Sequence, residues 1–213
     1  MISYQLAFEP QKGGQCLALS CPANEILFEG TRGSMKTATQ LMKFRSYVGL
    51  GYGAFWKGVI FDLEFKNLGD IIAQSKKLFR RFDDGATFLS SNSDLKWKWP
   101  SGEELLFRYE QKSDGYWNYH GQEFPFIGHN ELTKRADSEF YESMFSCMRS
   151  SFRSIDYPKP DGSLLPPIPL MCMSTTNPFG VGHNWVKKRF IDPAPRGTIQ
   201  REHIKTVNPQ NDK

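Results

Sequence analysis

The sequence predicts an α/β fold with a mainly parallel central sheet flanked by helices. Four short apolar runs, at residues 26–28, 58–61, 124–127 and 170–173, are typical of strands that are buried on both faces. Segments with helical spacing of apolar residues follow the first three runs, as parallel strands require a crossover between them. With 213 residues and 39% hydrophobic content, the chain can bury one sizeable core.

The first apolar run leads into a phosphate-binding pattern, Gly30-Thr31-Arg32-Gly33-Ser34-Met35-Lys36-Thr37. A tight loop before a helix aims backbone N–H groups and the helix dipole at phosphate oxygens. Lys36 would reach the outer phosphates, and the Thr37 hydroxyl would hold Mg²⁺. Met35 stands where the pattern has glycine, which costs about 1–2 kcal/mol if the position needs positive φ. The alternative is a glycine-rich turn before an ordinary helix.

The segment ahead of this strand has turn residues at 10–15 and a short apolar stretch at 16–19. Folded over a nucleotide base, it would let the Gln15 amide pair with an adenine edge, because an amide offers a donor and an acceptor together. A solvated turn glutamine is the alternative interpretation.

A helix over about 68–79 should follow the second strand. Its basic end, at residues 76–81, suits a helix C-terminus, with contact to DNA phosphates as the alternative. Aromatic and apolar residues then alternate on both sides of 100–103, which predicts an antiparallel hairpin insertion. We expect its aromatic side chains to pack across the strands rather than stack on bases.

The third strand ends in Asn130 and Glu131. In phosphate-loop ATPases such a strand ends in an Asp that holds the Mg²⁺ shell and a Glu that polarises the attacking water. Glu131 therefore fits the catalytic base, and Asn130 occupies the metal-side position without its charge. Asp62 or Glu64, after the second strand, would be alternative sources of that charge. A chance polar strand end is the remaining alternative.

The fourth strand stops at a polar stretch, 174–177, that ends in Asn177. Hydroxyl and amide groups at the carboxyl edge of a sheet lie where a γ-phosphate sensor must be, although they also occur in ordinary turns. A basic amphipathic segment covers 182–190. From Pro193 onward, Pro, Gly and polar residues predict a linker, so we divide the chain into a domain at 1–192 and a linker at 193–213.

Composition sets the remaining limits. The net charge of +4 permits nucleic-acid contact without arguing for it. The four cysteines have no paired C-x-x-C spacing and the four histidines lie far apart, so neither a zinc site nor a disulfide framework is expected. No segment has the length and apolarity of a membrane span, and no signal pattern opens the chain, so we expect an intracellular protein without a membrane partner.

In this order, the motifs resemble the ATPase domain of the large terminase subunit of tailed bacteriophages, a P-loop NTPase of the ASCE, RecA-like type. The resemblance covers nearly the whole chain and includes Glu131-Leu132-Thr133, Thr176-Asn177-Pro178 and the basic segment at 182–190. It departs from the family pattern at Met35 and Asn130. In that family a nuclease domain follows, and the predicted linker would lead toward it.

The resemblance implies ATP hydrolysis that powers translocation of double-stranded DNA into a procapsid, with ATP and Mg²⁺ as cofactors. It implies Lys36, Arg32 and Glu131 as catalytic residues, Thr37 and Asn130 at the metal, and Gln15, residues 30–37 and Asn177 at the nucleotide. A portal protein, the small terminase subunit and a homo-oligomeric ring are the implied partners, and the host cytoplasm is the implied location. Arg149 and Arg153 are candidates for an arginine that acts on a neighbouring subunit. A catalytically silent nucleotide-binding assembly module and a helicase-like ATPase are the alternatives.

Overall fold

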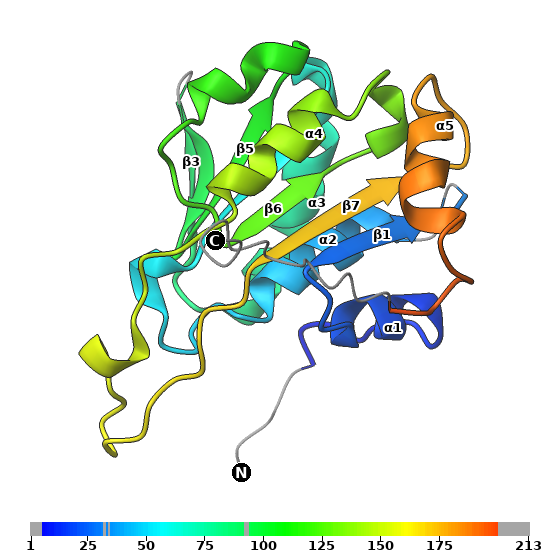
Figure 1. Cartoon of the computed structure of the whole chain (residues 1–213). Coiled ribbons are helices and arrows are strands. Elements are labelled where there is room, and N and C mark those ends of the chain that lie inside the picture. The colour runs from blue at the N-terminus through cyan, green and yellow to red at the C-terminus, as the bar shows by residue number, and fades with distance from the viewer. Residues whose placement is uncertain (1–5, 32, 34, 92–93, 200–213) are drawn as a thin grey trace, which may run out of the picture.

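The computed structural model describes residues 6–31, 33, 35–91 and 94–199, which form helical layers on both faces of one seven-stranded sheet (Figure 1). The strands are β1 (Glu25–Glu29), β2 (Lys57–Asp62), β3 (Thr87–Ser90), β4 (Leu95–Lys98), β5 (Glu104–Tyr109), β6 (Phe126–His129) and β7 (Met171–Thr176). The helices are α1 (Gly14–Ser20), α2 (Lys36–Arg45), α3 (Leu68–Phe79), α4 (Glu139–Ser143) and α5 (His183–Val186), with several 3₁₀ turns between them.

The strand order is β1-β7-β6-β2-β5-β4-β3. The first five strands of this order pair in parallel, whereas β4 and β3 pair antiparallel to their neighbours. The predicted fold class is therefore confirmed. All four predicted core strands are present, and β7 runs on to Thr176, so the hydroxyl residues expected after it belong to the strand itself.

The predicted hairpin is β4 and β5, but its second strand is not an insertion. β5 pairs in parallel with the whole of β2, and β3 adds a further antiparallel strand outside β4. The alternating pattern of β5 reflects this position, because Leu105 and Phe107 face the same apolar core as Trp97 on β4. The strand thus belongs to the parallel sheet and to the hairpin at once.

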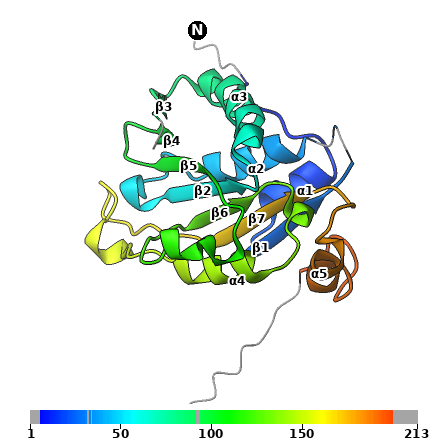
Figure 2. The same ribbon diagram turned by 90° about the horizontal axis from the view of Figure 1, so that it is seen from above.

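Helices α1, α2 and α3 cover one face of the sheet (Figure 2). Eight of the ten residues of α2 are buried, so its polar side chains need partners inside the protein. The Gln40 amide donates to the carbonyls of His129 (3.2 Å) and Met173 (2.7 Å), which ties α2 to β6 and β7. Gly58 lets the Phe44 ring rest on β2, since a Cβ there would lie 2.7 Å from that ring.

The opposite face is covered by α4 and by the 3₁₀ segment Ser113–Asn118 (Figure 2). Phe61, Tyr119 and Phe140 pack edge to face here, with ring centroids 4.9–6.3 Å apart. The helical segment expected after the third apolar run is α4 followed by a 3₁₀ turn, Met144–Cys147. The opening segment, for which we predicted only turns and an apolar stretch, forms α1.

The basic segment at 182–190 is α5 with a π-helical turn, Lys187–Ile191. Beyond it, Arg196 forms an ion pair with Glu29 at the end of β1 (2.9 Å). The division at residue 192 stays a prediction. None of the helices in the described part of the chain has the length and apolarity needed to cross a membrane.

Candidate functional site

The loop between β1 and α2 holds the predicted phosphate-binding residues. The Gly30 N–H donates to the Thr176 carbonyl of β7 (3.2 Å), which places the loop at the carboxyl edge of the sheet. Gly33 has φ +88°, and Met35, directly before α2, has φ +56° and ψ +23°. Met35 therefore adopts the left-handed conformation, the case in which we expected a cost of about 1–2 kcal/mol. Arg32 and Ser34 lie outside the described residues.

Lys36 lies over this loop and is only 8% exposed. Its ammonium group donates to the carbonyls of Gly30 (2.8 Å) and Thr31 (3.1 Å) and to the Asn177 amide oxygen (3.0 Å). These acceptors are neutral, so a phosphate oxygen arriving at the loop would offer the cation a stronger partner.

Asn177 joins Lys36 to the predicted catalytic base. Its amide nitrogen donates to the Glu131 carboxylate (2.6 Å), while its oxygen accepts from Lys36. Glu131 has φ +52° and ψ +55°, an uncommon conformation for a residue other than glycine. It lies two residues beyond the end of β6. The structure thus brings together Lys36, Glu131 and Asn177, which the sequence places up to 141 positions apart.

A hydrogen-bonded row crosses the ends of three adjacent strands beside this group. The Asn130 amide donates to the Asp62 carboxylate (2.7 Å), and the Thr175 hydroxyl donates to the Asn130 oxygen (3.1 Å). The backbone N–H of Glu131 donates to the same Thr175 hydroxyl (3.4 Å). Of the two alternative acidic residues, only Asp62 contacts Asn130; Glu64 instead pairs with Lys66 (2.8 Å).

A cavity of about 450 Å³ opens at this edge. It is lined by Gly33, Met35, Lys36, Thr37, Gln74, Glu131, Lys134 and Asn177. Gln74 on α3 and Lys134, three residues after Glu131, are additions that we did not predict. Lys134 adds a second cation to the pocket, and only its closeness to Glu131 in sequence was a signal for it.

Three predicted residues lie elsewhere or have other uses. Gln15 is 4% exposed, and its amide accepts from the Gln11 N–H (2.7 Å) and donates to the Thr39 hydroxyl (2.8 Å). That amide links α1 to α2, and the expectation that Gln15 reads an adenine edge stays a prediction. Arg149 donates to the Gly121 carbonyl (3.0 Å) and Arg153 pairs with Asp156 (3.6 Å), both at the surface and neither lining the pocket.

The polar groups at the pocket suit a magnesium ion held together with a nucleotide. Mg²⁺ prefers oxygen ligands and is usually held by one or two carboxylates plus substrate phosphates. Thr37 and Glu131 line the pocket and provide a hydroxyl and a carboxylate, and the Asn130 oxygen lies beside the pocket, joined to the Glu131 N–H through the Thr175 hydroxyl. Among the described residues, no cluster of three or more His, Cys, Asp or Glu could hold a metal by itself, so the phosphates would have to complete the shell.

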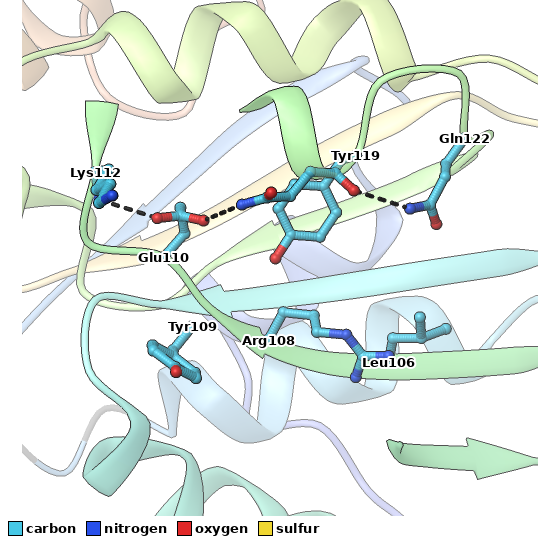
Figure 3. A pocket seen from close by; sticks show the side chains of 8 residues that line it. Leu106, Arg108, Tyr109, Glu110, Lys112, Tyr119 and Gln122 are labelled. Carbon is cyan, nitrogen blue, oxygen red and sulfur yellow. Dashed lines mark hydrogen bonds between the residues drawn. The ribbon is translucent and has the colours of Figure 1, made fainter. Parts of the chain in front are cut away.

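A second hollow, of about 500 Å³, lies beside the end of β5 (Figure 3). The Glu110 carboxylate there accepts from the Lys112 N–H (3.0 Å) and the Asn118 amide (3.2 Å). Burial raises the pKa of Tyr119 to about 12, so this phenol stays neutral. None of the predicted site residues lines this hollow.

No protein-family model and no curated protein matches the sequence. Solved structures do match. The large terminase ATPase domain of Thermus phage P74-26 is 15% identical with a TM-score of 0.61, and the match covers 92% of this chain and 74% of that one. The large terminase of a second, thermophilic bacteriophage is 16% identical with a TM-score of 0.59, over 86% of this chain and 43% of that one.

The same thermophilic-phage terminase in complex with ADP is 14% identical with a TM-score of 0.56, over 86% of this chain and 42% of that one. At identities this low the matches show the fold alone, and they extend over most of the chain. The chain spans less than half the length of that terminase. This chain has the α/β fold of the phage large terminase ATPase domains that it matches.

Proposed function

We propose that this chain is an ATP-binding and ATP-hydrolysing motor domain that drives double-stranded DNA into a viral procapsid. The observation that carries the proposal is the contact of Lys36 and Glu131 through Asn177, at the mouth of a cavity beside the phosphate loop. A cation for the phosphates and a carboxylate for water are groups that phosphoryl transfer to water uses, and the Asn177 amide holds them together.

In this proposal Lys36 exchanges its loop carbonyls for phosphate oxygens and stabilises the charge that develops on them. Arg32 would contribute in the same way. Glu131 accepts hydrogen bonds from the attacking water and holds it in line. Thr37 and Asn130 would hold Mg²⁺, whose positive charge helps to neutralise the phosphates.

Asn177 fits a sensor of the γ-phosphate. Its amide bridges Lys36 and Glu131, so one neutral side chain connects the two charged groups. A γ-phosphate near Lys36 would compete for the same donors and free the Glu131 carboxylate for water. Because Asn177 directly follows β7, this change would reach the segment at 178–191 that carries α5.

The proposed setting follows the structural relatives. We propose ATP and Mg²⁺ as cofactors, and double-stranded DNA, a portal protein and a small terminase subunit as partners. The chain would act in a homo-oligomeric ring in the host cytoplasm, with residues 193–213 linking it to a nuclease domain. A catalytically silent nucleotide-binding module is the second candidate, favoured by the strained Met35 and the uncharged Asn130.

Titration of a fluorescent ADP analogue into the wild type, Lys36→Ala and Lys66→Ala tests nucleotide binding. Lys36→Ala should lose most of the affinity, because it removes the cation of the phosphate loop. Lys66 is an exposed lysine outside the pocket, so Lys66→Ala should bind as the wild type does. Equal affinity in all three proteins would contradict the assignment. Steady-state ATP turnover of the wild type then separates the motor from the silent module.

A further inference from the structure

Asp62 is held in place beside Asn130 by the register of the sheet. β2 and β6 pair in parallel with Phe61 opposite His129, so the next residues, Asp62 and Asn130, come side by side at the carboxyl edge. Asp62 is 1% exposed, and its carboxylate accepts from three donors: Asn130 Nδ2 (2.7 Å), Asn67 Nδ2 (2.9 Å) and the Glu64 N–H (3.3 Å). Donors from the segment after β2 and from the residue after β6 therefore fix the position of the Asp62 carboxylate.

The charge of Asp62 is not cancelled by a direct ion pair. Within the described residues, no Lys or Arg nitrogen lies within 4.0 Å of this carboxylate. Arg135 is a buried cation nearby, with its guanidinium 4.4 Å from the centre of the Phe140 ring. Burial lowers the pKa of Arg135 to about 10, against the attraction of Glu110 and Asp62, so Arg135 stays charged.

The contact with Asp62 changes what Asn130 offers to a cation. A hydrogen bond donated to a carboxylate is stronger than one between neutral groups, and it polarises the amide so that its oxygen becomes more negative. The Thr175 hydroxyl holds that oxygen from the other side (3.1 Å) and fixes the orientation of the amide. The Asp62 carboxylate at the end of the neighbouring strand thus increases the negative partial charge on the Asn130 oxygen.

Building on the proposed ATPase function, we propose that Asp62 supplies the negative charge of the magnesium site and acts through Asn130 as a positioning residue. The carboxylate that the family pattern places at the end of β6 stands instead at the end of β2, one strand away. Asn130 provides the oxygen that faces the ion, and Asp62 provides the charge behind it.

Four variants test this proposal: Asp62→Asn, Asn130→Asp, the double exchange Asp62→Asn/Asn130→Asp, and Glu64→Gln as control. The control removes one carboxylate two residues away that does not contact Asn130. For each protein, the affinity for a fluorescent ADP analogue is measured in EDTA and over a range of Mg²⁺ concentrations. The readouts are the affinity without metal and the Mg²⁺ concentration at which half of the metal-dependent gain is reached.

Asp62→Asn should raise the Mg²⁺ requirement about 5–30-fold, the difference between a charge-assisted and a neutral hydrogen bond, and leave the affinity in EDTA unchanged. Asn130→Asp should not lower the requirement, because it places a second carboxylate where the Asn130 amide now donates to Asp62 (2.7 Å), and neighbouring carboxylates oppose each other's ionisation. The double exchange should return to the wild-type requirement, since one carboxylate and one amide are present again. Glu64→Gln should match the wild type.

An Asp62→Asn protein with the wild-type Mg²⁺ requirement would overturn the proposal, and so would an Asn130→Asp protein with a lower one. If Asp62→Asn does not fold, the double exchange decides, because a folded double variant that still needs more Mg²⁺ contradicts the exchange. A wild type that binds ADP in EDTA but shows no gain with Mg²⁺ also refutes this proposal and leaves the nucleotide site standing. A wild type that binds no ADP refutes the proposed function together with it.

Discussion

Replacing Met35 by glycine should stabilise the protein. Met35 has φ +56° and is 38% exposed, so the strain of its backbone is large compared with the packing that its side chain contributes. Relief of the left-handed conformation is worth about 1–2 kcal/mol. Glycine also gives the unfolded chain more conformational freedom, which offsets about 0.4–1 kcal/mol of this gain. The expected net gain is about 0.5–1 kcal/mol.

Thermal and chemical denaturation measure this gain, with Met35→Ala as the matched control. A gain of that size corresponds to a rise of about 1–4 °C in Tm for a domain of this length. Alanine removes the same side chain but keeps Cβ, so Met35→Ala should show no gain. If alanine stabilises as much as glycine, or if glycine destabilises, the left-handed strain is not the dominant effect at this position.

The other predictions concern stability and assembly. The His129 ring is buried, and neither ring nitrogen has a partner among the described residues. Burial, and to a smaller extent the charge of Arg135, holds the pKa of His129 well below the usual 6.5. Below about pH 6.5 the imidazole is therefore protonated only in the unfolded chain, which lowers the stability of the fold. His129→Phe should therefore remove about 2 kcal/mol of the stability lost between pH 7.5 and 5.0, and an unchanged pH dependence in urea unfolding would contradict it. Gly182→Ala should cost about 1–3 kcal/mol, because its Cβ would lie 1.9 Å from the Arg135 carbonyl, whereas Gly69→Ala, with open space around it, should be neutral or stabilising. If Arg149 or Arg153 acts on a neighbouring subunit, ATP turnover per chain should rise with protein concentration and the alanine variant should lose that rise; turnover independent of concentration argues against both.

Local patterns were enough to predict the loop and the strand ends. The phosphate loop, Glu131 and Asn177 each follow a short apolar run, and parallel strands bring such ends to one edge. The pattern of glycine positions also identified Met35 as a left-handed residue, because only that conformation makes glycine the usual choice there.

The partners across the sheet could not be predicted in the same way. That Asp62 contacts Asn130 depends on β2 lying next to β6, and strand order is set by long-range packing that no local pattern encodes. The place of β5 in the parallel sheet depends on the same order. The contact of Gln15 with Thr39 could not be predicted either, because Thr39 is on another helix and the contact forms only once α1 packs on α2.

The long separations within the pocket determine when, under the proposed function, a nucleotide could first bind. Lys36 and Asn177 are 141 positions apart, and the last contributing strand, β7, pairs with β1 near the start of the chain. Closing so long a loop is slow, and the pocket is not complete before β7 has paired in the sheet. A chain still on the ribosome could therefore not capture nucleotide until residues beyond 177 had emerged. At a free nucleotide concentration of about 100 times the Kd, binding would add about 2.7 kcal/mol to the free energy of unfolding of the completed fold. Partly folded stages without β7 would gain none of this stability.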